Sequence, residues 1–342
     1  MSRHVSGTAY QAIEHDADGR PFRVITVTME AGLSVRIMPD RGLDIADCWY
    51  RGRALHWDGW APAAAPVTGL HGAEWERHFF GGILTTCGLA NVGEPSEGHG
   101  LHGRYNHLPA SRVSVEHVEQ DGSTSIVITG SIAEATLDGG LLTLERTITL
   151  ASGVASLSVR DVVTNHGSSP TPAPLLYHLN FGGSLLAGDC RVAVDDRVET
   201  VNEFGDWRQL PGGWQYPGKS RDCEPVTVEH LLNEGTPTGI ATISSATTGI
   251  VVAVTWDRRS QPRLLQWINT NGTDRVMALE PANCGTKGRS FDRSRGTLPV
   301  LNAGESRTSS FTIKAEPHIS AARQRELALV TSRTETNLEI TP

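Results

Sequence analysis

The chain has 342 residues, of which 38% are hydrophobic and 20% are charged, and its formal net charge is −8. This balance is that of an ordinary globular protein with a sizeable core, and the acidic excess argues against a general nucleic-acid-binding surface. The first residues lack a secretory signal pattern, and no apolar run reaches the roughly 20 residues that span a bilayer, so we expect a soluble cytoplasmic protein without membrane partners.

Strand signals dominate the chain. Its 36 glycines and 18 prolines separate short runs rich in Val, Ile, Thr and Leu, a pattern typical of an all-β sandwich or barrel. The sequence predicts strands at Arg23–Met29, Leu33–Met38, Val113–Val118, Ser125–Ile132, Leu141–Leu150, Ala155–Thr164, Arg191–Val194, Gly239–Ser244, Gly249–Trp256, Leu264–Asn269, Val276–Glu280 and Thr308–Lys314.

The clearest predicted hairpin joins Leu141–Leu150 to Ala155–Thr164. Apolar and polar residues alternate along both arms, and Ser152 and Gly153 supply the turn. Arg146 and Asp161 interrupt the apolar faces and, counted from the turn, lie roughly diagonally across the pair. Two interpretations stay open: a buried or edge ion pair, or a face that lines a binding concavity.

Helical patterns are scarce. Residues 320–331 could form one short terminal helix, and the polar residues after Ser332 resemble a loosely ordered tail. The Gly/Pro-rich stretch from Asn202 to Pro225 resembles a long loop, and loops of this length are often functional. We therefore predict one β-sandwich domain over residues 1–316 and a C-terminal short helix and tail over 317–342.

Two glycine-containing motifs precede the middle of the chain. Gly98–Arg104 reads Gly-His-Gly-Leu-His-Gly-Arg, in which glycine permits close backbone approach, and His102 and Arg104 suit a polar ligand. A surface turn with incidental histidines is the plainer interpretation. Pro39–Ile45 reads Pro-Asp-Arg-Gly-Leu-Asp-Ile directly after a strand, and Arg41 is either a site residue or the partner of Asp40 in a local ion pair.

Two later segments each carry a candidate acid or base. His178 lies in the mostly apolar segment Leu175–Gly182, where a hydrogen-bonded core histidine and a general acid or base are both plausible. Glu280 ends an apolar strand before Pro281, which cannot continue a central ladder. A carboxylate in this position is expected at the rim of a sheet, either solvated or desolvated enough to act as a base.

The order of these elements resembles the aldose 1-epimerase (galactose mutarotase) superfamily. Leu-His-Gly with a nearby Arg comes first, His-Leu-Asn-Phe follows, and Leu-Glu-Pro comes last. The resemblance extends from about Tyr10 to Lys314, and it is greatest to an incompletely characterised DUF4432-like branch with similar Pro-Asp-Arg-Gly-Leu-Asp-Ile and Leu-His-Gly-Arg elements. It implies a large β-sandwich, the galactose mutarotase-like supersandwich, with few short helices and a sugar site on its concave face.

The resemblance also implies a reaction that needs no cofactor. Glu280 would take the proton of the anomeric hydroxyl and His178 would protonate the ring oxygen, which opens a cyclic sugar and lets it reclose as the other anomer. His102, Arg104, Arg41 and Asn180 would bind the substrate. Trp207 or Trp214 could cover an apolar sugar face, although a tryptophan more often serves packing.

The sequence departs from the superfamily at the substrate wall. The usual His-Pro-Tyr-Phe-Asn element is Tyr-His-Leu-Asn-Phe here, and Asp206 and Asp222 are only candidates for the sugar-binding aspartate.

The five scattered cysteines form no CxxC pair, and the His-x-x-His of His99 and His102 is not a specific metal spacing, so we expect free thiols and neither metal nor cofactor.

The sequence is compatible with three functions. The first is an aldose 1-epimerase-like isomerase acting on a small sugar, with a homodimer possible. The second is a non-catalytic carbohydrate-binding protein, which would have no need for His178 and Glu280 to converge. The third is a different sugar isomerase or lyase on the same scaffold. The identity of the sugar and its charge stay open.

Overall fold

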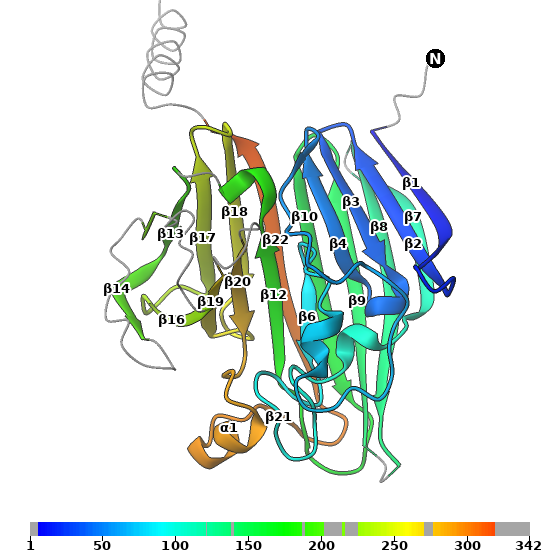
Figure 1. The fold of residues 1–342 in the computed structure, drawn as a ribbon, viewed down its shortest axis with the longest axis vertical. Coiled ribbons are helices and arrows are strands. Elements are labelled where there is room, and N and C mark those ends of the chain that lie inside the picture. Colours follow the sequence, from blue (N-terminus) through cyan, green and yellow to red (C-terminus); the bar gives the residue numbers. More distant parts are fainter. Residues whose placement is uncertain are drawn as a thin grey trace, which may run out of the picture.

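The computed structural model describes residues 6–120, 122–137, 140–186, 189–201, 214–215, 225–269 and 276–318. Its strands form two layers that pack face to face around one large hydrophobic core (Figure 1). One layer is a nine-stranded sheet, and the other is made of a five-stranded and a six-stranded sheet. The predicted all-β sandwich is therefore confirmed. Within the described residues, no helix is long and apolar enough to cross a bilayer.

The nine-stranded sheet contains most of the predicted strands, because its residues alternate between a buried and an exposed face. Its order is β15-β13-β17-β18-β22-β10-β9-β8-β7. In chain order these strands are β7 (Ser111–Gln120), β8 (Ser123–Ala135), β9 (Leu141–Ala151), β10 (Ser156–Asn165), β13 (Arg191–Val194), β15 (Trp214–Gln215), β17 (Thr238–Ser245), β18 (Ile250–Asp257) and β22 (Ser306–Pro317).

The second layer supplies the remaining long strands. The five-stranded sheet is β1 (Gly7–His15), β2 (Pro21–Met29), β3 (Leu33–Met38), β4 (Asp44–Tyr50) and β5 (Arg53–Ala54), in that order. The six-stranded sheet, in spatial order, is β14 (Asp196–Val201), β16 (Val226–Leu232), β19 (Arg263–Asn269), β20 (Val276–Ala282), β12 (Leu175–Phe181) and β6 (Thr85–Gly88). Backbone bridges from Ile45 to Leu84 and from His56 to Phe181 connect the two sheets.

Short elements complete the described chain. β11 (Thr171–Pro172) pairs with β21 (Val300–Leu301), and α1 (Arg289–Arg295) packs at the lower end in Figure 1. The 3-10 helices are η1 (Pro39–Arg41), η2 (Glu74–His78), η3 (Tyr105–His107) and η4 (Gly183–Leu186). The predicted helix over 320–331 lies outside the described residues, and the division at residue 316 stays a prediction.

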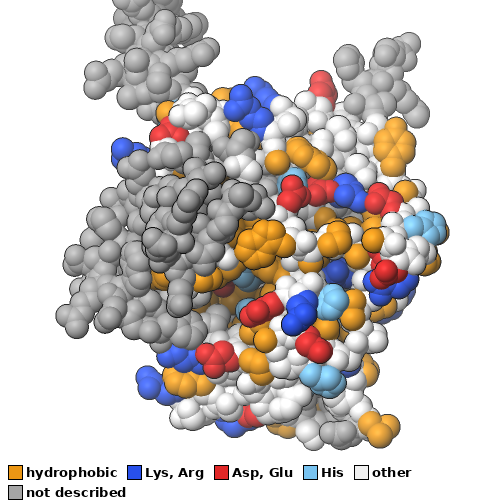
Figure 2. Space-filling view, in the orientation of Figure 1, with side chains coloured by type: hydrophobic (Ala, Val, Ile, Leu, Met, Phe, Trp, Pro, Cys, Tyr) orange, Lys and Arg blue, Asp and Glu red, His pale blue; other side chains and the backbone are white. Residues whose placement is uncertain are grey.

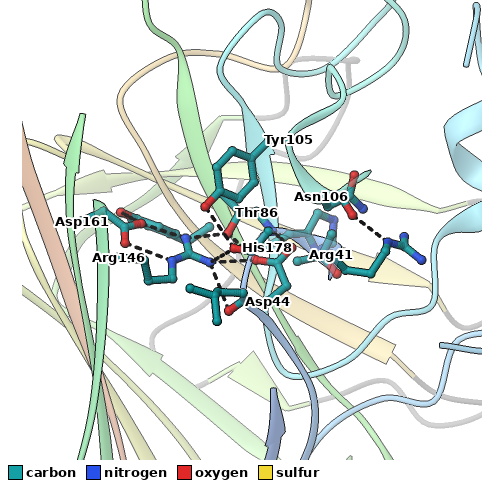
Figure 3. Close-up of polar contacts among 12 residues, drawn as sticks. Arg41, Asp44, Thr86, Tyr105, Asn106, Arg146, Asp161 and His178 are labelled. Carbon is teal, nitrogen blue, oxygen red and sulfur yellow. Dashed lines mark hydrogen bonds and ion pairs between the residues drawn. The ribbon is translucent and has the colours of Figure 1, made fainter. Parts of the chain in front are cut away.

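The Arg146–Asp161 pair is a buried ion pair, as one of the two interpretations held. The residues are directly opposite each other in the β9–β10 ladder rather than diagonal, because the hairpin register pairs them. Arg146 donates from Nε and Nη2 to Asp161 at 2.9 and 2.7 Å and from Nη1 to Asp44 Oδ1 at 2.9 Å, and all three side chains are fully buried (Figure 3). This hub joins the two layers and does not line a surface concavity.

Candidate active site

The candidate site is built on the outer face of the six-stranded sheet. Both faces of the central strands β12 and β20 are buried, so every residue of these strands is shielded from solvent. Tyr177 and Leu179 point into the large core between the layers. Leu176, Leu265 and Ala282 instead belong to a smaller cluster on the opposite face. His178 and Glu280 share this outer face, because side chains alternate along a strand.

The ladder places His178 opposite Glu280. β12 and β20 pair Leu176 with Ala282 and Leu179 with Leu279, and this register aligns positions 178 and 280. His178 Nε2 lies 3.3 Å from Glu280 Oε1, and the two side chains are 7% and 3% exposed. A histidine and a carboxylate that could exchange a proton are thus held together away from bulk water. The structure brings together the two residues predicted to be the acid and the base.

The expectation that Glu280 ends its strand at a sheet rim is wrong. β20 continues through Pro281, which pairs with Leu264 on β19, to Ala282. Proline is tolerated here because the β12–β20 pairing is interrupted between the pairs Leu176–Ala282 and Leu179–Leu279, so the missing N–H of Pro281 breaks no pair of this ladder. Glu280 is therefore a central, desolvated carboxylate.

Aromatic rings surround the pair. The rings of Phe79 and Trp267 lie 5.2 and 5.6 Å from that of His178, and the ring of His102 lies 6.1 Å away. Trp57 packs against Phe79 and Trp267 at 5.6 and 6.1 Å. On the face shown in Figure 2, hydrophobic side chains surround a recess that has acidic, basic and histidine side chains near its rim. The arrangement is typical of small-molecule sites, which combine apolar walls with a few fixed polar groups.

Several polar atoms of these residues lack a hydrogen-bond partner among the described residues. They are Trp57 Nε1, His178 Nδ1 and Asn180 Oδ1. Asn180 is fully buried, and its amide nitrogen donates to the carbonyl oxygens of Gly81 and His178 at 3.2 and 3.1 Å. A buried polar group without a partner costs free energy, so such groups are expected where a ligand supplies the missing bond.

His102 is held by the backbone of Gly93. The Gly93 N–H donates to His102 Nδ1 at 3.3 Å, and the His102 N–H donates to the Gly93 carbonyl at 2.9 Å. Burial lowers the pKa of His102 to about 4, so the ring is neutral at pH 7. Because Nδ1 accepts a hydrogen bond, the ring proton lies on Nε2. His102 therefore presents a hydrogen-bond donor beside His178.

Gly93 must be glycine for this arrangement. Its φ is +75°, and a Cβ there would lie 1.8 Å from the carbonyl oxygen of Thr286. We expect Gly93→Ala to cost more than the about 1–2 kcal/mol of the left-handed conformation alone, because the backbone must also move. Urea unfolding checks this against Gly19→Ala, which has φ +77° and open space around its Cβ. Equal losses in the two variants would contradict the steric argument.

The two predicted arginines have other partners. Arg41 is buried and donates to the carbonyl oxygen of Asn106 at 2.6 Å (Figure 3). It also donates to the carbonyl oxygen of His78 at 3.1 Å, and its guanidinium lies over the Phe80 ring. It is not paired with Asp40, which binds Arg23 at 2.6 Å. The structure thus places the Arg41 guanidinium against backbone and not beside the His178–Glu280 pair, and a role in substrate binding stays a prediction.

The Arg104 side chain points away from the His178–Glu280 pair. It pairs with the buried carboxylate of Glu134 at 2.9 Å and lines a separate cavity of about 640 Å³, whose lining includes neither His178 nor Glu280. His99 lines that cavity too, whereas His102 points towards His178. Side chains of the Gly98–Arg104 segment therefore face two different places, the separate cavity and the His178–Glu280 pair. A role for Arg104 at the His178–Glu280 pair stays a prediction.

Sequence reasoning missed the aromatic walls. Trp57, Trp75, Phe79 and Trp267 lie in separate segments, and only the fold brings them together. The candidate residues Asp206, Trp207 and Asp222 lie outside the described residues, as does the side chain of Trp214. Four of the five cysteines are described, and each is a buried free thiol, as expected.

The buried histidines predict a pH-dependent stability. Burial lowers the pKa of His178 to about 3 and that of His107 to about 2, from an ordinary 6.5. Below pH 6.5 the unfolded chain binds more protons than the native state, so full stability is present above this pH and is lost progressively as the pH falls. Buried Asp44, whose pKa burial raises to about 6, opposes this trend.

The histidine contribution can be isolated by substitution. Between pH 7.5 and 5.0, each such histidine is expected to remove up to about 2 kcal/mol from the free energy of unfolding. Urea unfolding of wild type and His178→Asn at both pH values is the measurement. We expect a smaller loss in the variant. An equal loss would show that His178 is not held neutral in the native state.

The family described as Domain of unknown function (DUF4432) matches residues 19–315. The chain belongs to the DUF4432 family. No curated protein matches it. The expected DUF4432-like resemblance is thus confirmed.

Solved structures share the fold of this DUF4432 protein. A "putative aldose 1-epimerase" from Klebsiella pneumoniae has a TM-score of 0.80 at 22% identity, with 93% of this chain and 86% of that chain covered. A galactose mutarotase-like protein from Clostridium acetobutylicum has a TM-score of 0.57 at 15% identity, covering 90% and 98%. A galactose 1-epimerase from Lactobacillus acidophilus has 0.57 at 14% identity, covering 91% and 99%. At these identities the likeness shows a galactose mutarotase-like fold.

Proposed function

We propose that this DUF4432 protein is a cofactor-independent aldose 1-epimerase-like isomerase that interconverts the anomers of a small sugar. One observation carries the proposal: His178 and Glu280 are opposite each other in a central ladder, 3.3 Å apart and buried among aromatic rings. Ring opening of a cyclic hemiacetal needs a base at the anomeric hydroxyl and an acid at the ring oxygen, and this pair provides both. A protein that only binds sugar does not need the pair.

The empty site and the substrate-bound site are expected to differ in the charge of His178. Burial lowers the pKa of His178, which favours the neutral imidazole in the empty site. A bound sugar replaces apolar surroundings with hydroxyl groups that solvate charge. We infer that the imidazolium–carboxylate form, with His178 charged, is populated when substrate is bound.

The reaction then proceeds by two proton transfers. Glu280 accepts the proton of the anomeric hydroxyl while His178 donates its proton to the ring oxygen, and the C1–O5 bond breaks to give the open aldehyde. The aldehyde turns about C1–C2. In reclosure on the other face, His178 takes the proton back from the C5 hydroxyl, and Glu280 gives its proton to the carbonyl oxygen, which becomes the anomeric hydroxyl. The Nε2–H of His102 donates to a sugar hydroxyl, and Trp57, Phe79 and Trp267 cover the apolar faces of the ring.

We further propose that the sugar is neutral. Arg41 donates to backbone carbonyls, Arg104 pairs with Glu134, and Arg263 pairs with Glu229 at 2.6 Å. Among the described residues, each of these three arginines already has a partner, so binding an anionic sugar through any of them would require breaking an ion pair or several hydrogen bonds.

Anomer exchange by NMR tests the proposal. Wild-type protein is added to a panel of neutral aldoses and the corresponding uronic acids, and exchange is measured against the spontaneous rate. We expect saturable acceleration on at least one neutral aldose and a lower kcat/KM on its uronic acid. No acceleration on any sugar by folded protein would overturn the isomerase proposal. Tighter binding of a sugar without exchange would favour the non-catalytic alternative.

A further inference from the structure

A second polar cluster lies where the five-stranded and six-stranded sheets meet. Asp47 lies on β4, and His56 and Asp58 follow in an extended segment that bridges to Phe181 and Gly81. His56 Nε2 is 3.2 Å from Asp47 Oδ1 and 3.1 Å from Asp58 Oδ1, and the three ligand atoms lie within 4.8 Å of one another. One nitrogen and two carboxylate oxygens therefore converge on one point.

Neighbouring groups orient two of these side chains. Arg36 binds Asp47 through Oδ2 at 2.7 Å, which leaves Oδ1 directed at His56. The Cys48 N–H donates to His56 Nδ1 at 3.1 Å, and the Cys48 carbonyl oxygen lies 3.0 Å from the same nitrogen. Metal binding through Nε2 requires the ring proton to move to Nδ1, where the Cys48 carbonyl accepts it, and the Nε2 lone pair then faces two carboxylates. Metal-binding histidines usually have such a second bond to a backbone carbonyl or a carboxylate.

The charges of the cluster do not balance with a neutral histidine. Arg36 is shared between Asp47 and Glu14, each at 2.7 Å, so it offsets only part of the negative charge. Asp58 is 85% exposed, and its carboxylate contacts His56. A neutral His56 can offer one N–H to one carboxylate at most. A cation between the three ligand atoms would satisfy all of them.

We propose that Asp47, His56 and Asp58 bind a divalent transition metal ion of the Zn²⁺ type. Ligand atoms at about 2.0–2.1 Å from a tetrahedral Zn²⁺ are separated by about 3.3 Å, close to the two nitrogen–oxygen distances in the cluster. The imidazole ligand favours Zn²⁺ over Ca²⁺ and Mg²⁺, which prefer oxygen ligands alone. The remaining position is open to water because Asp58 lies at the surface.

The proposed metal ion would hold Trp57, an aromatic residue of the candidate active site, in a fixed position. Trp57 lies between His56 and Asp58 in an extended segment, so its side chain points to the opposite side. That side faces Phe79 and Trp267, which surround His178. The metal ion would fix both neighbours of Trp57 without contacting the sugar. This inference is independent of the proposed isomerase activity.

Titration calorimetry with ZnCl₂ tests the proposal on the full chain after treatment with EDTA. We expect one Zn²⁺ per chain in wild type and at least about 10-fold weaker binding in Asp58→Asn, whose exposed position leaves the fold intact. Asp18→Asn, at another exposed aspartate, is the matched control and should bind like wild type. MgCl₂ should not compete.

Thermal unfolding gives a second readout. Zn²⁺ should raise the Tm of wild type and of Asp18→Asn but not that of Asp58→Asn, because a ligand stabilises only the state that binds it. The alternative is a protonated His56 that forms ion pairs with both aspartates. Wild type that takes up no Zn²⁺, or Asp58→Asn that binds it as tightly as wild type, would overturn the metal site in favour of that alternative.

Discussion

Glu280→Gln and His178→Asn are each expected to slow anomer exchange by about 10²–10⁴-fold, the range typical of losing a general acid or base. Glutamine keeps the size of Glu280 but cannot accept a proton from the anomeric hydroxyl. Asparagine at 178 cannot deliver a proton to the ring oxygen. NMR exchange rates on the best neutral aldose measure both effects, and the loss should fall mainly on kcat.

Controls separate chemistry from folding. Glu145→Gln changes a carboxylate that is 52% exposed on β9, in the other layer, and should exchange anomers at the wild-type rate. Circular dichroism of all variants should match wild type. A folded Glu280→Gln protein that retains full activity would show that Glu280 is not the base.

Arg146→Met is expected to produce the largest loss of stability in the molecule. The substitution leaves Asp44 and Asp161 fully buried without their cation, and breaking a buried pair in this way costs about 3–5 kcal/mol. More than one partner is affected, because Arg146 also donates to Thr86 Oγ1 at 2.9 Å and Tyr177 donates to Asp161 at 2.8 Å. Urea unfolding at pH 7 measures the loss.

Arg112→Met is the matched control for this loss. Arg112 is 77% exposed and its distance to Glu145 is 3.4 Å, so its removal should change the free energy of unfolding by less than about 1 kcal/mol. The Arg146→Met loss should shrink at low pH, where protonation of Asp44, whose pKa burial raises to about 6, removes part of the uncompensated charge. A loss below about 1 kcal/mol at pH 7 would mean that the hub does not hold the two layers together.

The sequence was most informative where one strand face is buried and the other is exposed. Every predicted strand is present, with its ends close to the predicted ones, and the β9–β10 hairpin follows its alternation. β12 was not predicted as a strand. Both its faces are buried, so its residues do not alternate, and His178 and Asn180 interrupt its apolar run, whereas β20, which is buried on both faces too, begins with four apolar residues and was predicted. Pro281 led to the wrong prediction that Glu280 lies at the rim of a sheet. The interrupted β12–β20 pairing that accommodates this proline cannot be recognised in the sequence.

The acid–base pair could be proposed from sequence only through family resemblance. Register across a sheet decides that His178 and Glu280 meet, and nothing local to either segment encodes it. The arginines show the opposite case. Arg41 and Arg104 lie in motifs that suggest a polar ligand, but backbone carbonyls and Glu134 are their partners in the fold. The aromatic walls come from loops whose contacts depend on the whole tertiary structure.

A double-variant cycle in anomer exchange tests the central claim most directly. Wild type, Glu280→Gln, His178→Asn and the double variant are compared on one neutral aldose at pH 7. If the two residues act as one proton-exchanging unit, the double variant will be about as slow as the slower single variant, because removing either partner already disables the unit. Losses that multiply in the double variant, or a wild type no faster than the spontaneous reaction, would contradict the account.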